Sequence, residues 1–170
     1  MILVLFSGGV ESTVLLKYFL KETKEIVHVL NTGLGYADFT KPRLIEQKKT
    51  VYNILDYFKK NYRDFNFSSV QLNLNNINTL QQQKAGFGYD EQWNLFFAGM
   101  YAKIYVIKNI WLGKFSYDDY HRSELNLKPL SWYVDGTLEK YALLGTCLDF
   151  NFFKDLKINF PSRNFKKEGY

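Results

Sequence analysis

Apolar and polar positions along the chain predict strands and helices in turn. Short apolar runs bounded by polar or glycine-containing stretches are typical of buried strands, and they occur at residues 2–6, 25–33, 67–74 and 110–115. Apolar residues at helical spacing predict helices starting near Glu11 and covering 43–61, 91–107 and 136–148. This order predicts an α/β fold in one domain, residues 1–170, with a mostly parallel sheet and helices on both faces.

Several positions within these elements have a predicted structural role. His28 lies inside the second predicted strand, and we expect it to be packed there. Ala98, Gly99 and Ala102 are small, so we expect them to bring the third predicted helix close to the sheet. Residues 73–90 are rich in amides and then in glycine, which fits a substrate loop and a polar surface loop equally well.

The first predicted strand stops at Ser7-Gly8-Gly9, where two glycines allow a sharp turn with room for a ligand. A helix begins directly afterwards, so several backbone N–H groups point at one spot and the helix dipole adds roughly half a positive charge. A glycine turn of this kind also occurs in α/β units that bind nothing. Because ligands bind at the carboxyl ends of parallel strands, we expect Asn31 and Thr32 near this loop, where their backbone would meet a base. The stretch predicts an anion site.

Composition narrows the class of protein. The chain has 170 residues, 46% of them hydrophobic, which is enough for one core. Its formal charge of +5 is compatible with a polyanionic partner and is also ordinary for a globular domain. The single cysteine, Cys147, excludes an intramolecular disulfide and a cysteine-based zinc site, and it suits a reducing compartment. No stretch approaches the roughly 20 apolar residues of a membrane span, so we expect no membrane contact. Together with the single cysteine, this predicts a cytoplasmic protein without zinc.

The string Ser-Gly-Gly-Val-Glu-Ser-Thr at residues 7–13 resembles the SGGxDS signature of the N-type ATP pyrophosphatases, the PP-loop superfamily. The resemblance implies an adenine nucleotide alpha hydrolase-like fold, in which this loop holds the β- and γ-phosphates of ATP. Attack on the α-phosphate then releases pyrophosphate. Glu11 stands where the family has Asp, which keeps a carboxylate for Mg²⁺. With Asn31 added from the strand order, the predicted nucleotide-binding residues are Ser7, Gly8, Gly9, Glu11, Ser12, Thr13 and Asn31.

A second polar segment follows the fourth predicted strand, which would deliver residues 114–122 to the same sheet edge as the loop. Residues 118–124 and 98–102 resemble two segments of the 7-cyano-7-deazaguanine synthases within the superfamily. The chain lacks the four zinc-binding cysteines of these synthases and their Pro-Gly-Arg-Asn string. The resulting prediction is that Glu11, Lys114, Asp119 and Arg122 are catalytic, and that Glu11 and Asp118 bind Mg²⁺.

Three functions are compatible with this resemblance. The first is an ATP- and Mg²⁺-dependent adenylating enzyme that activates a small-molecule carboxylate, such as one on a 7-deazaguanine, for attack by ammonia. The second is a PP-loop enzyme that modifies RNA, which the net charge and the aromatic content of 18% permit. The third is a non-catalytic nucleotide-binding module. A homodimer is compatible with each of them.

Overall fold

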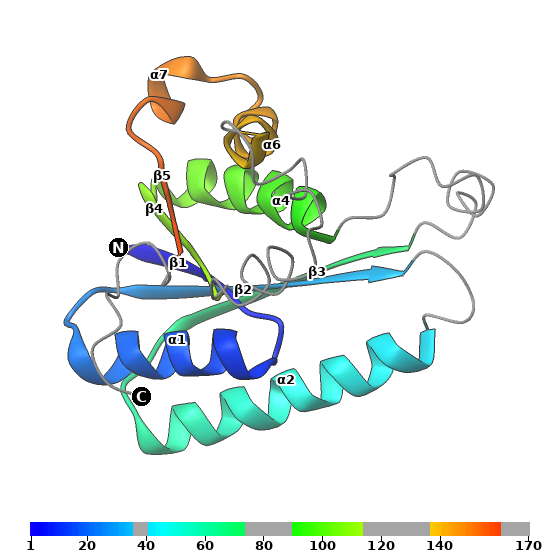
Figure 1. Ribbon diagram of the computed structural model, residues 1–170. Coiled ribbons are helices and arrows are strands. Elements are labelled where there is room, and N and C mark those ends of the chain that lie inside the picture. Colours follow the sequence, from blue (N-terminus) through cyan, green and yellow to red (C-terminus); the bar gives the residue numbers. More distant parts are fainter. Residues whose placement is uncertain (36–40, 74–89, 114–136, 161–170) are drawn as a thin grey trace, which may run out of the picture.

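The computed structural model describes residues 1–35, 41–73, 90–113 and 137–160, and within them strands and helices follow one another (Figure 1). The strands are β1 Ile2–Leu5, β2 Val27–Gly35, β3 Asn66–Asn73, β4 Asn109–Leu112 and β5 Lys157–Asn159. The helices are α1 Val10–Glu22, α2 Lys41–Asn61, α4 Asp90–Tyr105, α6 Thr137–Gly145 and α7 Phe150–Phe153. The predicted strands and helices are all present with ends shifted by a few residues, and α7 and β5 are additional elements.

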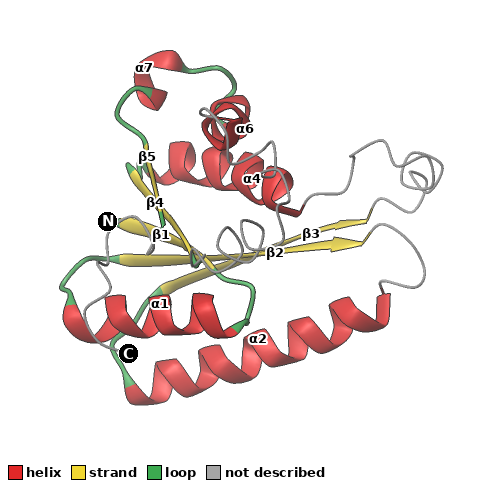
Figure 2. Ribbon diagram, viewed as in Figure 1, coloured by secondary structure: helices red, strands yellow, loops and turns green. Residues whose placement is uncertain are grey.

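The strands form one sheet in the order β3-β2-β1-β4-β5, and each neighbouring pair is parallel (Figure 2). Every residue of β1 is buried, which explains its unbroken apolar sequence, because helices cover both faces of a parallel sheet. The predicted α/β class, with a parallel sheet and helices on both faces, is therefore confirmed.

Successive residues of β2 point to opposite faces of the sheet and join two hydrophobic clusters. Val27 and Val29 pack with residues of α1 and α2 on one face. Leu30 packs with residues of α4 on the other face. Figure 1 shows α1 and α2 on one side of the sheet and α4 on the opposite side, with α6 outside α4. Among the described residues, no helix combines the length and apolar character needed to cross a membrane.

The small residues of α4 have two different roles. Ala98 and Ala102 are fully buried among the residues packed on the sheet, as predicted. The prediction for Gly99 is wrong, because Gly99 faces α6, where a Cβ atom would collide with the carbonyl oxygen of Ala142. At the same crossing, a Cβ atom on Gly145 of α6 would collide with the carbonyl oxygen of Phe96. Two glycines thus allow the backbones of α4 and α6 to touch.

His28 is buried between β2 and α4, which confirms its predicted packing role. The side-chain amide of Asn66 donates to its Nε2 at 3.2 Å, and the Tyr101 hydroxyl lies 3.2 Å from its Nδ1. Burial lowers the pKa of His28, and the nearby N-terminal ammonium lowers this pKa further. His28 is therefore neutral at pH 7, with both ring nitrogens occupied.

The strand order changes direction at β1. The chain runs outward from β1 to β2 and β3, and β4 then lies on the other side of β1. In such sheets, the crevice for a ligand lies where the loops after the two central strands diverge. Here those loops begin at Phe6, after β1, and at Gly113, after β4. A Cβ atom on Gly113 would lie 2.6 Å from the backbone of Ser12, so the chain after β4 is in contact with the first turn of α1.

Candidate functional site

The turn after β1 has the backbone conformation that its two glycines permit. Gly8 has a φ of +79°, in the left-handed region that residues with a Cβ atom rarely adopt. A Cβ atom there would also lie 2.9 Å from Cγ2 of Val51 on α2. Gly9 has extended backbone angles and is the residue immediately before α1. The turn therefore lies against α2 at Gly8 and leads directly into α1 at Gly9.

Hydroxyl groups hold this turn in place. The buried Ser12 accepts the backbone N–H of Ser7 at 3.3 Å and donates to the carbonyl of Gly9 at 3.1 Å. The hydroxyls of Ser7 and Ser12 lie 3.2 Å apart, and Thr13 donates to the Gly9 carbonyl at 2.8 Å. Ser12 and Thr13 thus shape the loop from within, while the loop's exposed surface comes from Ser7 and Gly9.

The N-terminus of α1 begins at this turn and is electrostatically suited to an anion. Gly9 provides no side-chain cap, so the end of the helix is not closed by the residue that usually performs this task. The first backbone N–H groups of a helix lack intrahelical partners and carry the positive end of its dipole. Glu11 lies in this first turn and is exposed. The predicted loop residues from Ser7 to Thr13 are therefore one compact structural unit.

Two amide side chains hold the end of β1 from the neighbouring elements. The buried Asn31 of β2 donates to the carbonyl of Phe6 at 2.7 Å, and its own Oδ1 accepts a hydrogen bond from Ser69 at 3.5 Å. Gln47 of α2 donates to the carbonyl of Ser7 at 3.1 Å. Asn31 is next to the loop, as predicted, and its side-chain amide has a structural task there. A nucleotide contact by Asn31 stays a prediction.

Strand β2 extends beyond the end of β1. The two strands pair only from Ile2↔Val27 to Leu5↔Leu30, whereas β2 pairs with β3 as far as Gly35. The carbonyl of Leu30 accepts the N–H of Phe6, so it points toward β1. Since backbone direction alternates along a strand, the N–H and C=O of Thr32 point the same way, past the end of β1. The Thr32 hydroxyl is held by Asn94 of α4.

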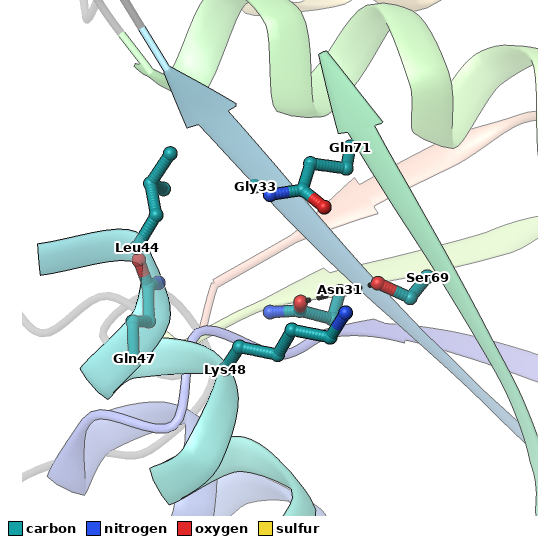
Figure 3. A pocket seen from close by; sticks show the side chains of 7 residues that line it. All are labelled: Asn31, Gly33, Leu44, Gln47, Lys48, Ser69 and Gln71. Carbon is teal, nitrogen blue, oxygen red and sulfur yellow. Dashed lines mark hydrogen bonds between the residues drawn. The ribbon is translucent and has the colours of Figure 1, made fainter. Parts of the chain in front are cut away.

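A pocket lies beside the loop, between the projecting parts of β2 and β3 and the N-terminal half of α2 (Figure 3). Among the described residues that line it, Leu44 is the apolar side chain and Lys48 the charged group. The lining residues are Asn31, Gly33, Leu44, Gln47, Lys48, Ser69 and Gln71. Because Asn31 and Gln47 also bind the end of β1, the pocket shares a wall with the loop.

This pocket was not predicted from the sequence. Residues 44, 47 and 48 share one face of α2 by helical spacing, and residues 69 and 71 share one face of β3 by alternation. These periodicities show which residues lie together on each element. Only the packing of α2 against the two strands shows that these two faces meet.

Four predicted site residues lie outside the described part of the chain: Lys114, Asp118, Asp119 and Arg122. Their catalytic and metal-binding roles stay predictions, although the residue before them, Gly113, contacts the first turn of α1. Residues 74–89, which include most of the amide-rich stretch, also lie outside it. Within the described ranges, no three His, Cys, Asp or Glu residues form a group that could hold a metal ion.

In comparisons with known proteins, no protein-family model matches this chain, and no curated protein matches it either. The features of the molecule that bear on its function are therefore the loop, its neighbouring pocket and the strand topology.

Proposed function

We propose that this protein is an ATP-dependent adenylating enzyme of the PP-loop type, with an adenine nucleotide alpha hydrolase-like fold. One observation carries the proposal. The SGGVEST string forms a glycine turn that opens into the N-terminus of α1, where Gly9 supplies no side-chain cap, beside the point where the strand order changes direction. Such a turn suits a phosphate group, because backbone N–H groups and the helix dipole act on an anion without having to change protonation.

In this proposal the loop binds the leaving pyrophosphate. The exposed Ser7 hydroxyl and the first turn of α1 donate hydrogen bonds to its oxygens, and the N–H of Gly9 exchanges its 3.3 Å bond to the Ser7 hydroxyl for one to a phosphate oxygen. Ser12 and Thr13 keep the loop preorganised through their bonds to the Gly9 carbonyl. Mg²⁺ offsets the charge of the crowded phosphates, and Glu11 in the first turn of α1 is its proposed protein ligand, together with Asp118.

The adenine base is proposed to bind the edge of β2 that extends beyond the end of β1. The N–H and C=O of Thr32 point past the end of β1, so they offer one donor and one acceptor side by side. The six-membered ring of adenine presents the complementary pair, an amino donor next to a ring-nitrogen acceptor. A base placed there lies above the end of β1, with its phosphates directed to the loop.

The proposed reaction has two steps. A carboxylate oxygen of the acceptor attacks the α-phosphorus of ATP, the bond to the β-phosphate oxygen breaks, and pyrophosphate leaves. Ammonia then attacks the acyl carbon, and AMP leaves with its oxygen to give an amide. Lys114, Asp119 and Arg122 are the residues proposed to act with Glu11, because they follow β4 in the sequence and β4 ends at the same edge of the sheet as β1.

The test is a product assay with ATP, Mg²⁺, ammonium and 7-carboxy-7-deazaguanine. We expect AMP and pyrophosphate in equal amounts, and no ADP. Gly8→Val should abolish turnover, whereas Lys17→Ala, an exposed change on α1, should leave it intact. ATP binding without AMP formation would instead support a nucleotide-binding module. Absence of both binding and turnover would contradict the proposal.

A further inference from the structure

We propose that one side of α2, together with the neighbouring edge of β3, is a binding surface for single-stranded RNA. This α2–β3 surface consists of two lysine pairs of α2, Lys48 with Lys49 and Lys59 with Lys60, the ring of Tyr52 between them, and the outer edge of β3. The inference goes beyond the proposed adenylation and does not depend on it, because these residues lie outside the phosphate loop.

The positive charge of the chain is concentrated on α2. Residues 41–61 include six basic and two acidic residues, so this helix carries +4 of the chain's formal charge of +5. The four lysines of the α2–β3 surface are exposed, and they make no ion pair within the described part of the chain. Asp56 is the acidic residue between the two pairs. The pairs are separated by three turns of helix, about 16 Å, so they can contact separate phosphates of the same strand.

Aromatic rings lie between the lysine pairs. Tyr52 is 41% exposed, and its ring makes a T-shaped contact with Phe67 of β3, with centroids 5.6 Å apart. The ammonium of Lys48 lies 6.0 Å from the centre of the Tyr52 ring, and the ammonium of Lys59 lies 5.8 Å from the centre of the Phe65 ring. Cations and rings therefore alternate along the surface. A base can stack on the Tyr52 ring while lysines on either side bind phosphates, which is how proteins bind single strands.

The edge of β3 adds hydrogen-bonding groups. In the described part of the chain, β3 is an outermost strand of the sheet. The carbonyl of Leu30 points toward β1, so the next residue, Asn31, directs its backbone groups to β3. Its partner in register, Ser69, therefore directs its own N–H and C=O away from β2, and Gln71 does the same. Figure 3 shows Lys48 reaching from α2 toward this strand.

These groups favour RNA over DNA. A ribose 2′-hydroxyl both donates and accepts hydrogen bonds, so it can pair with an edge that offers N–H and C=O groups in alternation. A strand whose base stacks on Tyr52 has its sugar beside that edge, because Tyr52 is in contact with Phe67 of β3.

The α2–β3 surface fits a single strand better than a duplex or a membrane. The bases of a duplex are stacked on one another, so a duplex offers Tyr52 no base face. A membrane-binding helix inserts an apolar face into the lipid. The apolar face of α2, which includes Val51, Leu55 and Phe58, is buried in the core instead. The partner that remains is a polyanion with accessible bases.

Fluorescence anisotropy with a labelled oligouridylate of about twelve nucleotides tests the surface. The full chain is used without ATP, and uracil is chosen because an adenine strand could also occupy the proposed nucleotide site. In about 50 mM salt we expect a dissociation constant of about 1–100 μM. The logarithm of the affinity should fall with the logarithm of the salt concentration with a slope of about −3, the value for four phosphate contacts on a single strand. The corresponding deoxy strand should bind at least about threefold more weakly.

The double variant Lys48→Gln/Lys59→Gln removes one cation from each pair. At about 0.1 M salt we expect it to weaken RNA binding about 10- to 30-fold and to reduce the salt slope by about 1.4. Lys140→Gln/Lys154→Gln is the matched control, because it makes the same charge change at exposed residues. These residues lie in α6 and directly after α7, across the sheet from α2 (Figure 1). The control should change the affinity less than about threefold.

Tyr52→Leu tests stacking separately from charge. It keeps an apolar side chain against Phe67 and removes the ring, so we expect binding to weaken about fivefold or more. Tyr52→Phe keeps the ring and should bind as the wild type does. Tyr57→Leu is the matched control, because Tyr57 is 57% exposed on the same helix and its ring contacts Phe58 and Tyr62. This control should change the affinity less than about twofold.

Several results would overturn the inference. They are no binding by the wild type at about 100 μM protein in low salt, and equal effects of the two double lysine variants. A loss in Lys48→Gln/Lys59→Gln without one in Tyr52→Leu would indicate a surface for any polyanion, and equal affinity for the deoxy strand would refute the choice of RNA. Because ATP is absent from every measurement, a failure here leaves the proposed adenylation intact, and a failure to form AMP leaves the RNA surface intact.

Discussion

At the scale of single residues, the backbone angle and the surroundings of Gly8 both require a residue without a Cβ atom. Its φ of +79° disfavours any side chain, and the space for a Cβ atom is taken by Val51. We expect Gly8→Ala to lower the free energy of unfolding by about 1–2 kcal/mol, the cost of a left-handed residue with a Cβ atom. Urea unfolding measures this change, and calorimetry with MgATP should show weaker binding, since the loop must shift.

Gly9→Ala is the matched control for this substitution. Gly9 has a φ of −74°, which alanine adopts freely, and a Cβ atom there meets only the Ser7 hydroxyl at 3.3 Å. The expected loss of stability is below about 1 kcal/mol, the cost of a poorer residue before the helix. A loss at Gly9 equal to that at Gly8 would refute the special role assigned to Gly8.

His28 is expected to make stability depend on pH. Burial lowers its pKa in the folded state, so between its ordinary pKa of about 6.5 and the lower folded value the unfolded chain binds the extra proton. The His28 contribution is therefore complete above pH 6.5 and is lost as the pH falls below it, by at most about 1.4 kcal/mol per pH unit. Urea unfolding at pH 7.5, 6.5, 5.5 and 5.0 measures the slope. His28→Gln should flatten it, and an unchanged slope would assign the effect to other groups.

At the scale of elements, the crossing of α4 and α6 depends on backbone contact. Gly99→Ala puts a methyl group against the Ala142 carbonyl, and neither backbone can move without separating the helices. We expect a loss of about 1–3 kcal/mol, as for other overpacked contacts. Ile104→Ala on the same helix is the control, because Ile104 is 68% exposed and should change the urea midpoint little. A stable Gly99→Ala protein would mean that α6 moves away at little cost.

Elements were predicted where the residues that define them lie close together in the sequence. β1 and the turn to α1 were predicted because an apolar run, two glycines and a helical repeat lie within twenty residues. β5 has only three residues, none of them buried, and it is defined by pairing with β4 about fifty residues earlier. Gly99 was assigned to the sheet because it lies between two sheet-facing alanines in the sequence. Its position on the helix points it to α6, an element whose packing no local pattern reveals.

At the scale of the whole molecule, the strand order places the candidate site. The order β3-β2-β1-β4-β5 puts the loop after β1 at the centre of the sheet, where the loop after β4 also begins. The loop residues were predictable from the sequence, because they are contiguous in the chain. Lys48 and Gln71 were not, because they come from different elements and line one pocket only after α2 has packed on β2 and β3.

Nucleotide binding should stabilise the whole fold, because the loop contacts α1, α2 and β2. At MgATP concentrations 100-fold above its dissociation constant, binding adds about 2.7 kcal/mol to the free energy of unfolding. For a chain of this size that corresponds to a rise in Tm of about 5–10 °C. Differential scanning fluorimetry with MgATP measures the shift, with Mg²⁺ alone as the reference. No shift at millimolar MgATP would contradict nucleotide binding.

Because β2 extends beyond β1, a backbone amide of β2 can report whether the proposed nucleotide site is occupied. Leu30 and Thr32 direct their backbone groups the same way, but only Leu30 has β1 beside it. The amide proton of Thr32 should therefore exchange with deuterated solvent much faster than that of Val29, which points to β3. If a base occupies this edge, the Thr32 proton should slow on addition of ATP while the Val29 proton keeps its rate. One backbone position would then report, without label or mutation, whether the site is full.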